Sequence, residues 1–126
     1  MELSDLTEKI IGCAFRVYNT LGSGFLESVY HKSLHIELEK SGLSSEVQKP
    51  IKVYYDYQPV GDFIADIIVN QLVVVELKAI QSLSKAHEVQ LVNYLKATGI
   101  PVGLLINFGE EKIEIKRKVK ELKSAE

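Results

Sequence analysis

Three ionisable residues stand inside apolar segments of the sequence, where a charge needs a partner. Asp66 interrupts the run from Phe63 to Val69, and Glu76 and Lys78 end the apolar run that follows it. Because burying an unpaired charge is costly, such groups are usually paired or bound to a metal. Glu76 and Lys78 are two residues apart, so on a strand both side chains point to the same face.

The connection between the two runs decides whether Asp66 joins this pair. A two-residue turn at Asn70-Gln71 would place Asp66 opposite Val75 and turn Glu76 to the other face. A three-residue connection that includes Leu72 would place Asp66 directly opposite Glu76, and such hairpins are the next commonest class. The chemistry considered below requires the second register, or a bulge with the same effect.

Two carboxylates that converge repel each other, and a divalent cation relieves that repulsion. Hard oxygen ligands suit Mg²⁺ or Mn²⁺. A lysine beside them could orient or deprotonate a water, or stabilise the charge that develops on a phosphate. Asp66, Glu76 and Lys78 therefore fit metal-assisted phosphodiester hydrolysis. The alternative interpretation is a charged hairpin end with a surface Glu–Lys pair, and the spacing alone leaves both open.

Hydrophobic periodicity predicts three helices and five strands in the order α-α-β-β-β-α-β-β. Ser4 or Asp5 could cap the first helix, with Glu8 reaching back, and the tail from Lys116 is expected to be helical or frayed. A strand meander followed by a crossover helix predicts an α/β fold with a mixed sheet flanked by helices. The expected helices are 4–20, 26–40 and 84–98, and the expected strands are 51–55, 63–69, 72–77, 101–108 and 113–115.

The composition is that of a globular domain, and residues 1–126 are expected to form one. Apolar residues make up 46% of the chain, enough for a core, and a single cysteine (Cys13) excludes an internal disulfide. No apolar run approaches the ~20 residues needed to span a bilayer, and the N-terminus lacks the features of a signal peptide. The expected compartment is the cytoplasm, with no membrane partner.

The charge balance does not by itself indicate a nucleic-acid binder. Fifteen basic residues against 17 acidic ones give a net charge of −2, whereas nucleic-acid-binding domains are typically basic. Residues 112–123 hold six basic side chains against two acidic ones, and this segment could contact phosphates. The competing interpretation is a solvated terminal helix.

Three short motifs together resemble one group of proteins. Asp66 followed after nine residues by Glu76-Leu77-Lys78 resembles the D…(D/E)xK signature of the restriction-endonuclease-like, or PD-(D/E)XK, nuclease superfamily. Gln90 and Tyr94, on one face of the third expected helix, resemble the QxxxY motif of several nuclease branches. Residues 24–30, Gly-Phe-Leu-Glu-Ser-Val-Tyr, match the signature of the small bacterial and archaeal GxxExxY family. The similarity extends from about residue 10 to residue 108.

This resemblance implies a restriction-endonuclease-like core and a role for each matching residue. Asp66 and Glu76 would be metal ligands, the backbone carbonyl of Leu77 a third, and Glu27 would complete the shell around Mg²⁺ or Mn²⁺. Lys78 would be the catalytic lysine. The implied activity is hydrolysis of DNA, or less readily RNA, by a metal-activated water, with a homodimer where both strands are cut. The alternative is a non-catalytic module of the same fold that binds nucleic acid or protein, and a third hypothesis is an enzyme acting on a small phosphorylated molecule.

Each remaining candidate also has a purely structural interpretation. Glu27 lies in the first turn of a helix, where the macrodipole favours acids. Tyr30 and Tyr94 could be core aromatics with a hydroxyl at the surface rather than substrate-binding residues. Gln90 could bind the scissile strand or cap a loop. The i, i+4 pair His31 and His35 has zinc-ligand spacing without a third ligand nearby, so a solvated pair is expected.

Overall fold

The computed structural model describes residues 2–120, and the segments appear in the predicted order. Four of the eight elements extend beyond their predicted bounds, and the other four begin one residue later than predicted. The third helix begins after Ser84 and ends before Gly99 as the sequence indicates. The elements are α1 (Leu3–Leu21), α2 (Glu27–Lys40), β1 (Ser45–Tyr55), β2 (Gln58–Val69), β3 (Val73–Lys78), α3 (Lys85–Thr98), β4 (Val102–Phe108) and β5 (Ile113–Val119).

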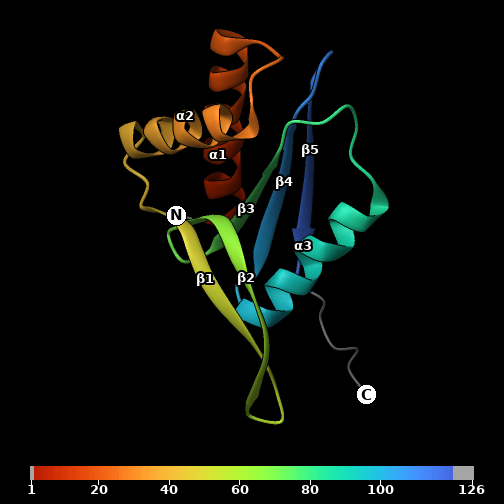
Figure 1. Cartoon of the computed structure of the whole chain (residues 1–126). Helices are drawn as coiled ribbons and strands as arrows, with labels where there is room; N and C mark the ends of the chain where they lie inside the picture. Colours follow the sequence, from red (N-terminus) through yellow and green to blue (C-terminus); the bar gives the residue numbers. More distant parts are fainter. Residues whose placement is uncertain (1, 121–126) are drawn as a thin grey trace.

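The five strands form one mixed sheet in the order β1-β2-β3-β4-β5 (Figure 1). The β3–β4 pair is parallel and the other three pairs are antiparallel. Parallel neighbours need a crossover connection, and α3 provides it. The predicted α/β fold with a mixed sheet and flanking helices is therefore confirmed.

Helices cover both faces of the sheet (Figure 1). Ile67, Val75 and Leu77 pack with α1 and α2 on one face, whereas Ile68 and Val74 pack with α3 on the other. This alternation follows from the two-residue period of a strand. It explains why the Val73–Val75 run is apolar at every position: the strand is buried on both sides.

The first hairpin is much longer than the sequence predicts. β1 begins at Ser45 and β2 at Gln58, so the two strands form an arm whose tip projects beyond the helices (Figure 1). The loop is only Asp56 and Tyr57, with φ of 51° and 63°, a combination found in tight hairpin turns whose twist matches the strands. Pro59 lies at an exposed position of β2, where a missing N–H is tolerated.

Two predictions about the chain ends are wrong. The segment 116–119 is neither helical nor frayed, because β5 continues to Val119 and pairs with β4 along its whole length. Lys123 and Glu121 of the basic segment lie outside the described residues. Neither Ser4 nor Asp5 caps α1, since the helix starts at Leu3 and Glu2 is the capping position without a side-chain hydrogen bond.

No helix within residues 2–120 is both long and apolar enough to cross a membrane.

Gly103 permits the close packing of α3 on the sheet. A Cβ at this position would lie 2.8 Å from Cδ1 and 3.0 Å from Cγ of Leu91, a side chain that is itself buried. We expect Gly103→Ala to lower the free energy of unfolding by about 1–3 kcal/mol, because the packed helix has to shift. Urea denaturation followed by circular dichroism measures this loss.

Gly61→Ala is the matched control, since no atom lies within 4 Å of a Cβ at that position. Its effect should stay within about 0.5 kcal/mol. Equal losses for the two variants would contradict the packing argument.

Candidate functional site

The β2–β3 hairpin has the register that places Asp66 beside Glu76. Val69 pairs with Val73, so three residues connect the strands. Asn70 and Gln71 adopt φ of 51° and 59°, and the Leu72 N–H donates to the Val69 carbonyl at 2.9 Å. The three-residue alternative is thus confirmed.

The two strands separate at Asp66, and side chains replace the backbone ladder there. The last paired residues are Ile67 and Val75. Beyond them the Asp66 N–H donates to Glu76 Oε2 at 2.9 Å, and the Leu77 N–H donates to Asp66 Oδ2 at 2.9 Å. Each carboxylate therefore binds the backbone of the opposite strand, and both sit in the opening between the strands.

The ladder on the other side of β2 is interrupted at the same residue. Val47 pairs with Ile67 and Lys49 with Ala65, but Gln48, which lies between them, has φ of 51° and no partner in the ladder. A positive φ at a non-glycine strand residue is unusual and is often found near functional sites. The Asp66 carbonyl is bonded instead to His31 Nε2 of α2, at 2.9 Å.

His31 is thus a site residue that the sequence analysis left as part of a solvated pair. A carbonyl can only accept, so the bond to Asp66 requires the proton on His31 Nε2. The Gln48 amide nitrogen lies 3.1 Å from the same ring atom and could donate to it only in the other tautomer. His35, one turn later, is held by Ser45, with 2.6 Å between Nδ1 and Oγ. The spacing of the two histidines indicated a shared helix face. The contact of His31 with Asp66 depends on the interrupted β1–β2 ladder, a tertiary feature that this spacing does not reveal.

Burial and a neighbouring negative charge act together on Glu76. The side chain is buried, and burial followed by the charge of Asp66 raises the pKa of its carboxyl from 4.5 to about 8. The Asp66 N–H and the ammonium of Lys78 oppose this shift. Without a bound cation, the ionised form of Glu76 is therefore strongly disfavoured.

Lys78 lies near the carboxylates but is not directly bonded to them. Its charge lowers the pKa of both Glu27 and Glu76, which places it near both groups. The side chain is half-buried, and among residues 2–120 it forms neither a hydrogen bond nor a direct ion pair. Its three N–H donors are therefore available to a substrate.

Glu27 reaches the cluster from the first residue of α2. Partial burial and then the charge of Asp66 raise the pKa of its carboxyl, while Lys78 and His31 lower it. The loop before it requires Gly24, whose φ is 101°. The helix start thus presents an acid toward the opening between β2 and β3.

Tyr30 fixes that loop and does not face a substrate. It is 0% exposed and stacks on Phe108 with ring centroids 4.5 Å apart. Its hydroxyl donates to the Gly22 carbonyl at 2.7 Å and accepts from the Phe25 N–H at 3.3 Å. The structure contradicts the predicted substrate-binding role, because the hydroxyl is enclosed and both of its bonds are used inside the protein.

Tyr94 approaches the cluster from α3, whereas Gln90 makes no contact with it. The Tyr94 ring stacks on Phe63 at 3.7 Å. Burial, then the charges of Glu76 and Asp66, raise the pKa of its hydroxyl, so the group lies within the field of the carboxylates. Gln90 lies one turn earlier and is exposed, and its contact with a nucleic-acid strand stays a prediction.

Asn107 is a second residue that the sequence analysis missed. It is fully buried on β4 opposite Lys78. Its side chain both accepts from the Ile80 N–H and donates to the Ile80 carbonyl, each at 2.9 Å, and also donates to Glu114. These bonds fix the chain directly after Lys78. A polar residue within an otherwise apolar strand was the available signal.

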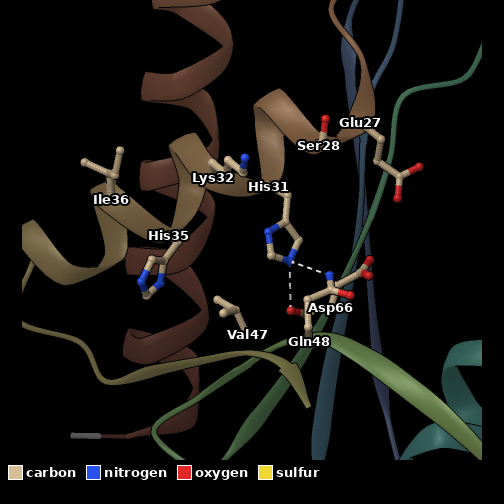
Figure 2. A pocket seen from close by; sticks show the side chains of 9 residues that line it. All are labelled: Glu27, Ser28, His31, Lys32, His35, Ile36, Val47, Gln48 and Asp66. Carbon is tan, nitrogen blue, oxygen red and sulfur yellow. Dashed lines mark hydrogen bonds between the residues drawn. The ribbon is translucent and has the colours of Figure 1, made fainter. Parts of the chain in front are cut away.

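A pocket of roughly 620 Å³ opens beside the carboxylates, between α2 and the first hairpin (Figure 2). Glu27 and Asp66 lie at one end and Ile36 at the other, with the two histidines between them (Figure 2). Its lining residues are Glu27, Ser28, His31, Lys32, His35, Ile36, Val47, Gln48 and Asp66.

The acidic side chains are near one another but are not arranged as ligands. Within residues 2–120, no three His, Cys, Asp or Glu side chains have the geometry that would hold a metal ion. Asp66 uses Oδ2 and Glu76 uses Oε2 for backbone hydrogen bonds, which leaves one oxygen of each carboxylate without a hydrogen bond. The donor types fit a hard divalent cation, and binding would require these side chains to turn.

A mixed sheet with helices on both faces, which parts at an Asp–Glu–Lys cluster, defines a restriction-endonuclease-like fold. The chain belongs to the PD-(D/E)XK nuclease superfamily, whose sequence profile matches residues 4–118. Membership of the narrower GxxExxY family stays a prediction.

One similar solved structure is described as "Crystal structure of SSO0001". It shares 19% sequence identity with this chain at a TM-score of 0.59, over 76% of this chain and 50% of the other. This chain therefore spans about half the length of that protein, and the likeness concerns the fold. A search of curated proteins found no match.

Removing the Tyr30 hydroxyl should weaken the loop that leads to Glu27. We expect Tyr30→Phe to lower the free energy of unfolding by about 1–2 kcal/mol, because the Gly22 carbonyl and the Phe25 N–H lose their partner while the ring stacking remains. Urea denaturation measures the change. Tyr57→Phe is the control, since Tyr57 is 97% exposed, and a comparable loss there would refute the explanation.

Glu76 should make the metal-free protein less stable as the pH rises. The folded state retains a proton on this carboxyl up to about pH 8, whereas the unfolded state loses it near 4.5. The unfolding free energy contributed by Glu76 therefore falls across that window. Glu76→Gln should remove this decline, so that the variant gains stability over the parent at pH 8.5 but not at pH 4.5.

Urea unfolding in the presence of EDTA at several pH values gives the free energy of unfolding of variant and parent. The contributions of other titrating groups cancel in the difference between the two. Glu110→Gln, at an exposed position, serves as the control. A difference that is independent of pH would contradict the assignment.

Proposed function

We propose that this protein is a metal-dependent nuclease that hydrolyses phosphodiester bonds of DNA, with RNA as the second candidate substrate. The observation that carries the proposal is the pair of carboxylates, Asp66 and Glu76, at the point where β2 and β3 separate. Lys78 follows Glu76 on β3, and within residues 2–120 its ammonium forms no hydrogen bond or direct ion pair. Membership of the nuclease superfamily supports the same chemistry.

The cation would be Mg²⁺ or Mn²⁺, held by Asp66, Glu76, the Leu77 carbonyl and Glu27. Hard oxygen donors of this kind suit these ions. A cation would also relieve the repulsion that raises the pKa of Glu76. When bound, it would supply Lewis-acid activation of water and neutralise charge on the phosphate.

The remaining residues have distinct proposed roles. Lys78 donates to a phosphate oxygen or to the attacking water and stabilises the negative charge that develops during attack. Tyr94 orients a carboxylate or contacts a phosphate, and Gln90 contacts the strand beside it. Tyr30 acts as a positioning residue, because it fixes the loop that carries Glu27.

The organisation of the active protein is part of the same proposal. Residues 1–126 act as one domain in the cytoplasm. One chain offers one such site, so cutting both strands of a duplex would use a homodimer. Light scattering during gel filtration measures that oligomeric state.

Lys78→Ala should separate catalysis from metal binding. We expect cleavage of labelled single-stranded, duplex and branched DNA to fall by about 100-fold or more, because charge stabilisation in the transition state is lost. Mn²⁺ binding, measured by calorimetry, should persist. Glu76→Gln should lose both cleavage and Mn²⁺ binding, and Lys9→Ala, an exposed lysine on α1, should lose neither.

Two results would overturn the proposal. Cutting that survives both Lys78→Ala and Glu76→Gln would come from another protein in the preparation. A folded parent protein that binds nucleic acid but neither Mg²⁺ nor Mn²⁺ would be a non-catalytic binding module.

A further inference from the structure

The pocket that begins at Asp66 and Glu27 extends beyond the residues to which the proposed hydrolysis gives a role. It continues from the carboxylates along α2 toward Ile36 (Figure 2). Its volume of roughly 620 Å³ falls within the ~300–1,000 Å³ of small-ligand sites. A substrate phosphate at the carboxylates would therefore place an adjoining group of the substrate inside it.

The walls combine exposed apolar side chains with flat rings. Ile36 is 57% and Val47 41% exposed, and both line the pocket. The imidazoles of His31 and His35 are held in place by the Asp66 carbonyl and by Ser45. Fixed planar and aliphatic surfaces of this kind suit a planar heterocycle, since nucleobases stack readily on aromatic side chains.

Polar groups are also present at the same walls. Gln48 contributes an amide and Ser28 a hydroxyl, and both can hydrogen-bond the edge of a base. Lys32 adds a positive charge that suits a phosphate. This combination matches a nucleotide better than it matches a purely apolar ligand.

We propose that this pocket binds an unpaired nucleotide next to the scissile phosphate. Bases inside a duplex are stacked and paired, so a base enters a concave pocket only after it leaves the stack or where the strand is already single. The inference rests on the proposed nuclease function and specifies its substrate: single-stranded or locally unpaired nucleic acid.

The test uses binding without cleavage. Fluorescence anisotropy with a labelled single-stranded oligothymidylate and with a hairpin duplex, both in EDTA, compares the parent with Ile36→Glu. A carboxylate at the pocket wall should weaken single-strand binding by roughly 10-fold and leave duplex binding unchanged. Val60→Glu, on the hairpin arm and 63% exposed, is the control and should alter neither.

A second variant reports occupancy directly. The chain contains no tryptophan, so Ile36→Trp introduces a single tryptophan into the pocket, whose emission can be excited selectively at wavelengths beyond the absorption of tyrosine. The single-stranded oligomer should quench it through base stacking and the duplex should not. The corresponding Val60→Trp signal should not respond to either.

Several outcomes would overturn this inference without touching the nuclease assignment. These are an Ile36→Glu variant that binds both nucleic acids as the parent does, equal losses for single strand and duplex, and an unquenched Ile36→Trp. Quenching by thymidine monophosphate but not by the oligomer would also overturn it and would indicate a small phosphorylated ligand. Because these measurements need no cutting, failure of the parent protein to cleave any of the nucleic acids would reject the nuclease function and leave the pocket result interpretable.

Discussion

The structure depends on one local break at Asp66, where the pairing of β2 with β3 ends and its pairing with β1 is interrupted for one residue. A buried backbone N–H and C=O must find other partners when a ladder ends. Here the Glu76 carboxylate takes the N–H, and the His31 imidazole takes the C=O. The polar groups that satisfy the break are the same ones that define the candidate site. Opening the sheet and placing the carboxylates are therefore one structural event rather than two.

This arrangement has an energetic consequence for the metal-free fold. Two carboxylates meet at the opening, and burial makes the charge on Glu76 unfavourable. Two neighbours moderate that cost, the Asp66 N–H and the ammonium of Lys78, while the Leu77 N–H binds the other carboxylate, that of Asp66. Proteins commonly retain such unfavourable groups where function needs them, at the expense of stability. The buried acid is thus itself an argument for function, independent of the sequence motif.

The sequence predicted most of the fold because its signals were local. Apolar runs and the stop at Gly99 defined elements that the structure reproduces, and the spacing of Glu76 and Lys78 was sufficient to predict a common face for these two residues. The hairpin register remained open between two alternatives until the φ angles of Asn70 and Gln71 were known. The role of His31 could not be predicted from its own helix. It depends on the positive φ of Gln48 in β1, next to the Asp66 carbonyl of β2 that His31 bonds. A substrate-binding role for Tyr30 does not fit its complete burial. The GxxExxY motif identifies the residue but does not show whether its side chain is buried.

The position of α2 links these features. Its first turn presents Glu27 toward the carboxylates, its second turn carries His31, which holds the Asp66 backbone, and its third carries His35 and Ile36 on the pocket wall. Tyr30, on the opposite side of the helix, fixes the helix start to the core through Gly22 and Phe108. One helix therefore carries the pocket wall, the acid that faces the carboxylates and the imidazole that bonds the Asp66 carbonyl. The proposed nucleotide pocket and the proposed metal site share this single support, and the His31–Asp66 bond joins it to the sheet.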